Sequence, residues 1–488
     1  MKNIAALAVV LSLLFSLNAC KKKDSSPVTP NPPPPVTATE KDLLVDSVYL
    51  YSKEVYLWHS VLPSYEQFNP RQYEVSDEMT SAENVMNAIR AKEPLDRYSF
   101  VTTKEESSGL STGDNTDWGF FVKALALDYA YPLDSVHWFV SYVYKGSSAA
   151  TAGVQRGWYI NKINGTTLGY DQASVNVLND VFFGTSTSAT FEFTKPDGSI
   201  ATANLNKTEF TANSVLYDTV YNSTDKSKKV GYLVFNQFFG ATSRAELANA
   251  FSYFQQQGIN ELIVDLRYNR GGVTQTQDTL ADMIAPQSAN NQMMYQYLYN
   301  DSLQAGKYPL LRKYFGINSG NPFSPQSNII QYKKAGSLNL SRVLFIVTGS
   351  TASASELLIN NLRPYMDVKL VGDTTYGKPV GFFPIDIFKY SIYPISFKTV
   401  NSAGSADYYS GFAPDKLTPD GADKNWGDLE EPSLATALNY IITGSFGRRT
   451  GNTDEQNRQL LMQQKQFAPL SNKLSEKKFT GMFQEQKK

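Results

Sequence analysis

Apolar runs and helical spacing alternate along the chain between residues 207 and 446. Residues 230–235, 261–266 and 343–347 are apolar runs of the length of strands. Residues 242–257 have the spacing of a helix. Strands that alternate with helices predict an α/β sheet, whose strand carboxyl ends collect functional loops at one edge. We therefore expect a large α/β domain over this region.

Two other patterns precede this domain. Helical spacing in residues 41–59 and 81–91 predicts a small N-terminal helical region spanning 41–112. Between residues 115 and 206, strand-like runs and glycine turns predict a mostly β segment, inserted ahead of the α/β domain. Residues 287–331 are aromatic and polar without a clear period, so we expect an elaborated loop or lid there.

Residues 1–20 have the pattern of an export signal, with a charged start, an apolar run over 4–17 and the sole cysteine, Cys20, at the end. The alternatives are an ordinary secretory signal and a short membrane span, although the run is short for a span. Lipidation of Cys20 is favoured because a lysine-rich and then proline-rich linker follows over residues 21–40. The protein is then expected in the cell envelope, lipid-anchored to the outer membrane on its periplasmic or its surface face.

Composition limits the partners of the chain. Hydrophobic residues make up 42% and charged residues 19% of the 488 residues, which allows large buried cores. The net charge of −1 lacks the basic excess of nucleic-acid binders, so no nucleic acid is expected. Neither His-rich nor Cys-rich ligand spacing occurs, so we expect no metal and no other cofactor. Residues 447–488 are polar and predict a disordered or loosely helical tail.

Candidate chemistry begins where the strand 343–347 breaks into a small-residue turn and a helix opens near Ser353. A serine at such a turn lies beside unpaired backbone N–H groups and the positive end of the helix dipole. That place suits a nucleophile whose attack creates an oxyanion. The same letters also fit a capping box, with Ser353 as N-cap and Glu356 three residues later, which occurs at many ordinary helix starts.

The base for such a serine is not an obvious histidine. The chain has only His59 and His137, and both lie in segments outside the α/β domain. Lys378 instead follows in a turn marked by Gly377 and Pro379. A lysine partly removed from water loses its proton more easily than its reference pKa of about 10.4 implies. Lys378 is therefore a candidate general base.

Three stretches carry a resemblance to a known family. They are Ser-Ala-Ser-Glu at 353–356, Val-Gly-Asp-Thr-Thr-Tyr-Gly-Lys at 371–378, and Asp-Leu-Arg-Tyr-Asn-Arg-Gly-Gly at 265–272. Together they resemble the C-terminal-processing (tail-specific) serine proteases, including the spacing of 25 residues between serine and lysine. Two positions depart from the pattern. The usual proline is Arg270 here, and many members have a glutamine four residues after the lysine, where this chain has Phe382.

The resemblance implies a role for each matching residue. Ser353 would be the nucleophile, Lys378 the general base and Glu356 a supporting acid. The N–H groups of Gly272 and Ala354 would form the oxyanion hole.

A second resemblance lies in the inserted segment. Residues 146–165 combine an alanine-rich helix, a glycine turn, a strand and an Asn-Gly turn, which resembles the most recognisable stretch of a PDZ domain. Such domains add an extended C-terminal peptide to a sheet edge and hold its carboxylate on backbone N–H groups. By this resemblance, Gly119, Phe120 and Phe121 form the carboxylate-binding loop. The alternative is a domain that only regulates access or serves as a spacer.

These patterns predict a multidomain α/β+β protein, with an α/β protease core containing a parallel-rich sheet, an inserted PDZ-like domain and a small N-terminal helical region. The resemblance implies a serine endopeptidase that cleaves unfolded or C-terminally accessible polypeptides. The alternative is a catalytically inactive, lipid-anchored peptide-binding protein on the same fold. The sequence also leaves open whether a regulatory partner activates the enzyme.

Overall fold

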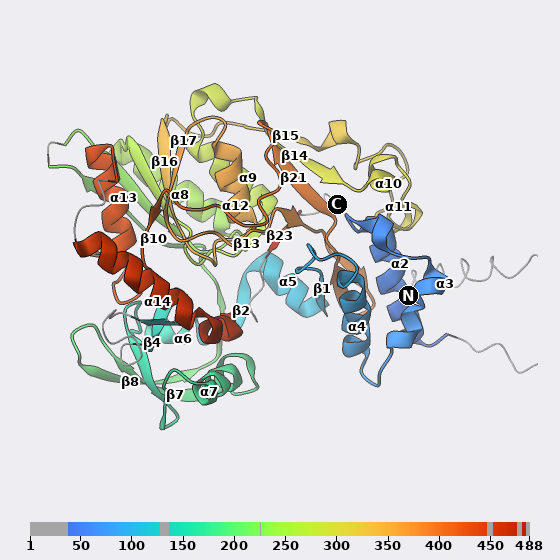
Figure 1. Ribbon diagram of the computed structural model, residues 1–488, viewed down its shortest axis with the longest axis horizontal. Coiled ribbons are helices and arrows are strands. Elements are labelled where there is room, and N and C mark those ends of the chain that lie inside the picture. Colours follow the sequence, from blue (N-terminus) through green and yellow to red (C-terminus); the bar gives the residue numbers. More distant parts are fainter. Residues whose placement is uncertain (1–37, 127–135, 225, 447–451, 476–480, 485–488) are drawn as a thin grey trace, which may run out of the picture. The chain divides into compact units, whose positions relative to one another are not determined.

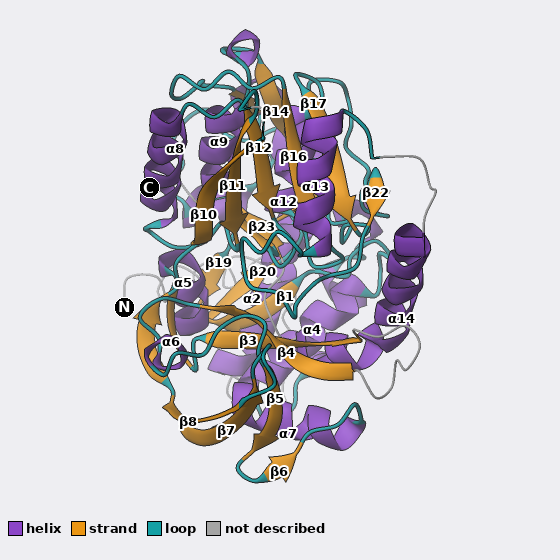
Figure 2. Cartoon of the chain, turned by 90° about the vertical axis from the view of Figure 1, so that its left-hand side faces the viewer, coloured by secondary structure: helices purple, strands orange, loops and turns teal. Residues whose placement is uncertain are grey.

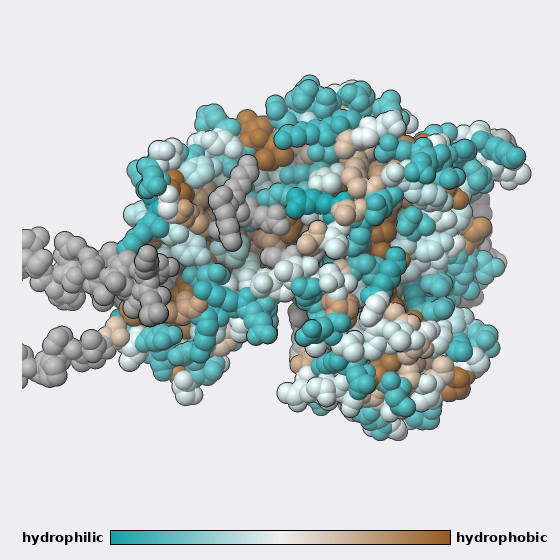
Figure 3. All heavy atoms as spheres, turned by 180° about the vertical axis from the view of Figure 1, so that it is seen from behind, coloured by the Kyte–Doolittle hydropathy of each residue, from teal (hydrophilic) through white to brown (hydrophobic). Residues whose placement is uncertain are grey.

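The computed structural model describes residues 38–126, 136–224, 226–446, 452–475 and 481–484. Cys20 and nearly all of the proline-rich linker lie outside these residues, so the predicted signal and lipid anchor remain predictions. No helix in the described ranges is long and apolar enough to cross a membrane. On the face shown in Figure 3, hydrophobic residues form small separate areas among hydrophilic ones.

A six-stranded sheet forms the centre of the fold (Figures 1 and 2). Its order is β10 (Val215–Asn222), β11 (Lys229–Phe235), β12 (Glu261–Asp265), β16 (Arg342–Val347), β17 (Asp367–Gly372) and β22 (Lys416–Leu417). The pair β10 and β11 is antiparallel, and every later pair is parallel. The expected mixed α/β fold with a parallel-rich sheet is thereby confirmed.

Helices cover both faces of this sheet, because its central strands are apolar on both sides. In β11, Val230, Tyr232 and Val234 pack in the cluster that includes α13 (Pro432–Thr443), while Leu233 and Phe235 join the larger core on the other face. The larger core includes apolar residues of α8 (Ser243–Gln257), α9 (Thr274–Ile284) and α12 (Ala354–Leu362). Figure 2 shows α13 on one side of the strands and α8 and α9 on the other.

The N-terminal region consists mainly of short and medium-length helices. It contains α2 (Glu40–Val55), η1 (His59–Val61), α3 (Tyr65–Phe68), η2 (Pro70–Tyr73), α4 (Glu78–Arg90) and α5 (Lys104–Thr112). The Asp77 side chain caps α4 by accepting a hydrogen bond from the Thr80 N–H group. The strand β1 (Phe100–Thr103) then pairs with β20 (Tyr390–Tyr393), which also pairs with β19 (Ile385–Ile387). The N-terminal region therefore continues into a sheet shared with a distant part of the chain.

The segment expected to resemble a PDZ domain forms an antiparallel sheet. Its strands are β3 (Phe120–Ala126), β4 (Val136–Val143), β5 (Tyr159–Ile163), β6 (Thr166–Thr167), β7 (Ser188–Thr194) and β8 (Ile200–Asn206), with helices α6 (Ser148–Thr151) and α7 (Gln172–Phe183). The short strands β2 (Asp114–Asp117) and β9 (Thr208–Thr211) pair where the chain enters and leaves this segment. Below, residues 114–211 are called the insert.

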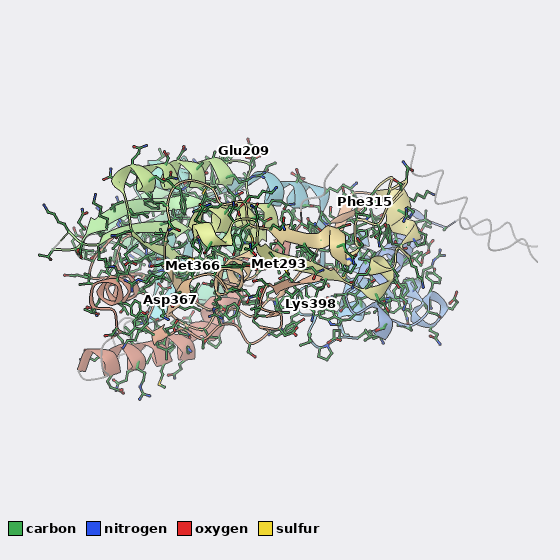
Figure 4. All side chains as sticks on the ribbon, turned by 90° about the horizontal axis from the view of Figure 1, so that it is seen from above. Glu209, Met293, Phe315, Met366, Asp367 and Lys398 are labelled. Carbon is green, nitrogen blue, oxygen red and sulfur yellow. The ribbon has the colours of Figure 1, made fainter. Side chains whose placement is uncertain are left out.

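The prediction of a loop or lid over residues 287–331 is wrong in part, because the strand β14 (Met293–Tyr299) lies within this range. This strand pairs with β15 (Ile329–Gln331) and with β21 (Phe397–Asn401), and β21 also pairs with β18 (Val380–Gly381). Met293 and Lys398, labelled in Figure 4, belong to the paired strands β14 and β21. Between β14 and β15 lie the short elements α10 (Asp301–Gln304), α11 (Pro309–Tyr314) and η4 (Pro325–Asn328).

The described part of the polar tail is more ordered than its composition suggests. It forms the helix α14 (Asn452–Ser475) and the strand β23 (Gly481–Phe483), which pairs with β13 (Gly271–Val273). Phe467 and Leu474 of α14 are buried in the core of the insert. The helical alternative therefore holds for α14, whereas disorder is wrong for the described residues, because a few apolar side chains in a polar stretch are enough to anchor it.

Candidate active site

Ser353 lies at the turn between β16 and α12, as the strand-to-helix pattern predicts. It is the N-cap residue of α12, with φ 62° and ψ −111°. A non-glycine residue rarely adopts a positive φ, and such strain is concentrated at functional sites. The Ser353 side chain is fully buried, and its Oγ atom has no hydrogen-bond partner among the described residues. The structure thus holds an unbonded hydroxyl at the start of a helix.

The Glu356 carboxylate ties the serine turn to the lysine turn. Its Oε2 atom accepts hydrogen bonds from the N–H groups of Ser353, at 2.9 Å, and Lys378, at 2.8 Å. Its Oε1 atom accepts from the Gly377 N–H group, at 2.7 Å, and the Thr375 hydroxyl, at 2.6 Å. Burial raises the pKa of Glu356, while these hydrogen bonds act in the opposite direction. Both predicted half-motifs therefore meet at one buried side chain.

Lys378 is fully buried beside aromatic rings. Its Nζ atom lies 4.6 Å from the centre of the Tyr98 ring and 4.4 Å from the centre of the Phe382 ring. Burial lowers the pKa of Lys378 to about 7, although the charges of Asp96 and Glu356 favour the protonated form. Phe382, at the position where a glutamine was expected, thus supplies an apolar wall that keeps water from the amine.

Tyr98 of the N-terminal region also lies at this site. The sequence did not reveal this position of Tyr98. The Asp96 carboxylate accepts hydrogen bonds from the N–H groups of Tyr98 and Ser99, both at 2.9 Å, and so forms a tight turn. The Tyr98 hydroxyl donates to the Gly377 carbonyl oxygen at 2.9 Å, next to the lysine. Burial raises the pKa of Tyr98 to about 12, so the hydroxyl stays protonated and can donate.

Asn269 fastens the glycine loop to the serine turn. Its side chain donates to the Phe235 carbonyl oxygen and accepts from the Gly271 N–H group, both at 2.9 Å. Its own carbonyl oxygen accepts from the Ala352 N–H group, at 3.0 Å, and from the Ser355 hydroxyl, at 3.1 Å. The loop after β12 and the turn after β16 are therefore held together by one buried asparagine.

Both positions of the Gly-Gly pair require glycine. Gly271 has φ +103°, and a Cβ atom added there would lie 2.9 Å from the Ser353 Cβ atom. Gly272 has φ +140°, and a Cβ atom there would lie 2.7 Å from the Phe238 carbonyl carbon. Because L side chains rarely adopt these angles, only glycine lets the backbone approach the serine so closely. Ala354, the other predicted oxyanion donor, is the first residue of α12.

The comparison with known families covers the region that builds this site. Residues 229–404 match the model of peptidase family S41. Residues 229–404 are therefore a peptidase family S41 domain. These residues contain Ser353, Glu356 and Lys378.

Relatives of the S41 domain have matching names. The chain is 25% identical over 238 residues to a carboxyl-terminal-processing protease from Picosynechococcus sp., covering 48% of this chain and 49% of that protein. It is 24% identical over 316 residues to a protein assigned as a CtpA-like serine protease from Staphylococcus aureus, covering 65% and 55% respectively. The chain thus spans about half the length of these relatives.

A solved structure shares the fold. The crystal structure of a protein assigned to the S41 proteases from Bacteroides fragilis aligns with a TM-score of 0.57 and 24% identity. The alignment covers 87% of this chain and 99% of that one. The shared fold therefore extends beyond residues 229–404.

A buried charge network supports the carboxyl end of β12 in the S41 domain. The Arg267 guanidinium binds the carboxylates of Asp265, at 2.7 Å, and Glu431, at 2.8 Å. Burial alone lowers the pKa of Arg267, but these carboxylates outweigh it and hold the pKa well above its usual range. Asp420 links this network to Arg156 of the insert, with an N–O distance of 3.4 Å. The network fixes the strand end from which the Gly-Gly loop departs.

A cavity of about 1030 Å³ opens beside the turn that precedes Ser353. The S41 domain contributes Thr348, Ser350 and Tyr376 to its lining, and the insert contributes Lys123. Arg97 and Tyr98 line it from the N-terminal region. The cavity has room for a peptide segment next to the serine turn.

The predicted carboxylate-binding residues lie in the insert rather than in the Glu356 network. Gly119 precedes β3, and its N–H group donates to the Asp117 carboxylate at 2.5 Å. Phe120 and Phe121 are buried, and both rings lie edge-on to Phe182. The N–H group of Gly119 is thus already bound within the chain.

The two histidines take part in other contacts. The His59 Nε2 atom lies 2.5 Å from the Asp301 carboxylate, and His137 in β4 stacks on Tyr159 with ring centres 4.1 Å apart. Burial lowers the pKa of His137. In the described residues, no group of three or more His, Cys, Asp and Glu side chains could hold a metal ion.

Proposed function

We propose that the protein is a serine endopeptidase of the C-terminal-processing kind, with Ser353 as nucleophile and Lys378 as general base. The observation that carries this proposal is the Glu356 carboxylate, which binds the backbone N–H groups of both residues. The lowered pKa of Lys378, about 7, supports it further, because a substantial fraction of the amine is then neutral near pH 7.

In the proposed first step, the Ser353 Oγ atom attacks the carbonyl carbon of a peptide bond while the neutral Lys378 amine takes the hydroxyl proton. The N–H groups of Gly272 and Ala354 stabilise the oxyanion. Lys378 then gives its proton to the leaving amine as the C–N bond breaks. A water molecule, deprotonated by Lys378, hydrolyses the resulting ester and releases the serine.

We propose unfolded or C-terminally accessible polypeptides as substrates, in keeping with the name of the Picosynechococcus relative. The insert would act as a PDZ-like domain that selects chain ends through Gly119, Phe120 and Phe121, with the bound carboxylate taking the place of Asp117 as acceptor of the Gly119 N–H group. Cys20 would carry a lipid that anchors the protein in the cell envelope. A regulatory partner would act by favouring the conformation in which the cavity beside the serine turn accepts a peptide.

The first test is the cleavage of an unstructured protein such as casein by the wild-type chain and by Ser353→Ala. We expect turnover in the wild type and a loss of at least about 10³-fold in both Ser353→Ala and Lys378→Ala. Ser252→Ala, which removes an exposed hydroxyl from α8, serves as the matched control and should retain full activity.

Equal turnover in Ser353→Ala would contradict the proposed nucleophile. Peptide binding without turnover in any form would instead favour the catalytically inactive binding protein.

A further inference from the structure

The C-terminal strand of the chain lies beside the Gly-Gly loop. In β23, Gly481 pairs with Gly271 and Met482 pairs with Gly272, in parallel register. The Gly481 N–H group donates to the Arg270 carbonyl oxygen at 3.2 Å. β23 is therefore an added strand on the loop that was predicted to supply an oxyanion donor.

The other edge of this strand is bound as well. The Phe382 N–H group donates to the Met482 carbonyl oxygen, and the Gln484 N–H group donates to the Phe382 carbonyl oxygen, both at 3.2 Å. Residues 481–484 thus fill a backbone groove between β13 and Phe382, which we call the strand groove. Recognition of a peptide by addition to strand edges is a general mode of binding.

The Gly481 carbonyl group lies next to Ser353. Its oxygen is 2.6 Å, and the Ser353 Cβ atom 2.9 Å, from the position that a Cβ atom on Gly271 would take. In a parallel ladder, a residue that donates to one position turns its carbonyl toward the N–H group two positions later. The donation to Arg270 therefore turns the Gly481 carbonyl toward the Gly272 N–H group. The Gly481 carbonyl group therefore lies beside both the Ser353 side chain and the Gly272 N–H group.

Side chains of the tail fit defined places along the strand groove. Met482 is fully buried, and its Cγ atom lies 2.7 Å from the position of a Cβ atom on Gly381. The Phe483 ring packs against Phe239, with ring centres 5.4 Å apart. A small residue followed by two apolar residues therefore matches the groove.

The same tail covers an edge of the insert. The helix α14 lies against both β3 and α7, and β3 is the edge strand of its sheet. The Ala124 N–H group of β3 donates to the Ser471 hydroxyl at 3.1 Å. Phe467 and Leu474 bury their side chains in the insert core. The tail thus binds the insert at the edge where a PDZ-like domain would take a peptide.

We propose that the strand groove is the substrate-binding site for a small residue followed by two apolar residues, and that residues 481–484 occupy it as an internal competitor. The identity of this groove as a substrate site rests on the proposed protease function. Occupancy by the tail is independent of catalysis and can be measured by binding alone.

The test uses a fluorescein-labelled peptide of residues 478–488 and full-length chains that carry Ser353→Ala, so that no peptide is cleaved. Fluorescence anisotropy measures peptide affinity with and without the additional change Met482→Asp, which places a charge in the buried Met482 site. Because a tethered segment competes at an effective concentration near the millimolar range, we expect the labelled peptide to bind at least about tenfold more tightly once the tail is displaced.

Three controls keep this experiment decisive. Met462→Asp changes a methionine of α14 that is 56% exposed, and should leave peptide affinity unchanged. A labelled peptide carrying Met482→Asp should fail to bind. A chain ending at Thr480 should reproduce the gain in affinity, should the point variant fold poorly.

If the wild-type peptide bound equally tightly to the Ser353→Ala chain with and without Met482→Asp, the tail would not act as an internal competitor. Equal affinity of the two peptides would overturn the predicted preference. Neither outcome depends on whether the wild-type chain cleaves casein, so the two proposals fail separately.

Discussion

At the scale of single residues, the surroundings of Lys378 determine how activity should depend on pH. Burial lowers its pKa to about 7, and only the neutral amine can take the serine proton. We expect kcat/KM for a peptide substrate to rise with pH along an acidic limb centred near 7. A limb near pH 10 would contradict the role of burial.

Phe382 offers a way to move that limb. Phe382→Gln places an amide beside the Nζ atom, and its oxygen stabilises the ammonium form, so the limb should shift to higher pH. Phe382→Leu keeps the wall apolar and should leave the limb near 7. If Phe382→Gln also left the limb near 7, the apolar character of position 382, whose ring centre lies 4.4 Å from Nζ, would have no part in setting the pKa.

Lys378 should also make the folded chain less stable against unfolding as the pH falls. Lys378 titrates near 7 in the folded chain and near its ordinary 10.5 when unfolded, so the unfolded state alone takes up the proton between these values. The wild-type chain therefore loses stability as pH decreases from 10.5 to 7. Lys378→Met carries no such penalty, and should gain on the order of 4 kcal/mol over the wild type between pH 10.5 and 7.

Urea unfolding of both proteins at pH 7 and pH 10 measures this difference. A constant gap between the variant and the wild type across that range would show that the lysine is protonated in the folded chain.

At the scale of elements, the carboxyl end of β12 depends on Arg267. Arg267→Met would leave the carboxylates of Asp265 and Glu431 buried without their cation, at a cost of about 3–5 kcal/mol. The urea midpoint at pH 7 should fall accordingly. Arg458→Met, which breaks an exposed ion pair with Glu455 on α14, is the matched control and should change stability by less than about 1 kcal/mol.

The elements that sequence could predict are those whose signals are local. The continuous apolar runs of β11, β12 and β16 predict buried strands without any knowledge of their neighbours. The Ser353 and Lys378 motifs lie 25 residues apart in the same domain. Tyr98 could not be placed in this way, because it reaches Lys378 through a sheet formed with residues almost 300 positions later. Its only signal was the Asp-Arg-Tyr-Ser stretch at 96–99.

The strand β23 was missed for a different reason. Three residues in a polar tail have no period, and their pairing with β13 depends on a loop that lies about 210 positions earlier. The same holds for β14, whose aromatic residues gain meaning only through pairing with β21. Backbone pairing over long separations is set by tertiary packing, which a single sequence does not display.

At the scale of the whole molecule, Arg156 joins the insert to the S41 domain. Its guanidinium donates to the Ser141 carbonyl oxygen at 2.7 Å within the insert. Outside the insert it donates to the hydroxyl of Tyr268 in the S41 domain, at 2.8 Å, and to the carbonyl oxygen of Lys424 beyond that domain, at 3.0 Å. Arg156→Ala should therefore uncouple unfolding of the insert from that of the S41 domain.

Tryptophan fluorescence reports mainly on the insert, which holds Trp118, Trp138 and Trp158, while far-UV circular dichroism reports on the whole chain. In urea, the two midpoints should coincide for the wild type and separate for Arg156→Ala, with fluorescence changing first. Coincident transitions in the variant would show that other contacts carry the coupling.

The shared Oε2 atom of Glu356 has a consequence for the timing of assembly. Ser353 lies three residues before Glu356, so their contact is local, whereas Lys378 follows the next strand of the central sheet. The lysine turn therefore reaches the carboxylate only once β16 and β17 are docked side by side. A nascent or half-folded chain would therefore carry a harmless serine and a fully hydrated lysine. The proposed Ser-Lys dyad would therefore form only in a chain that is already folded. Such a chain is no longer an unfolded substrate for another copy of the protein.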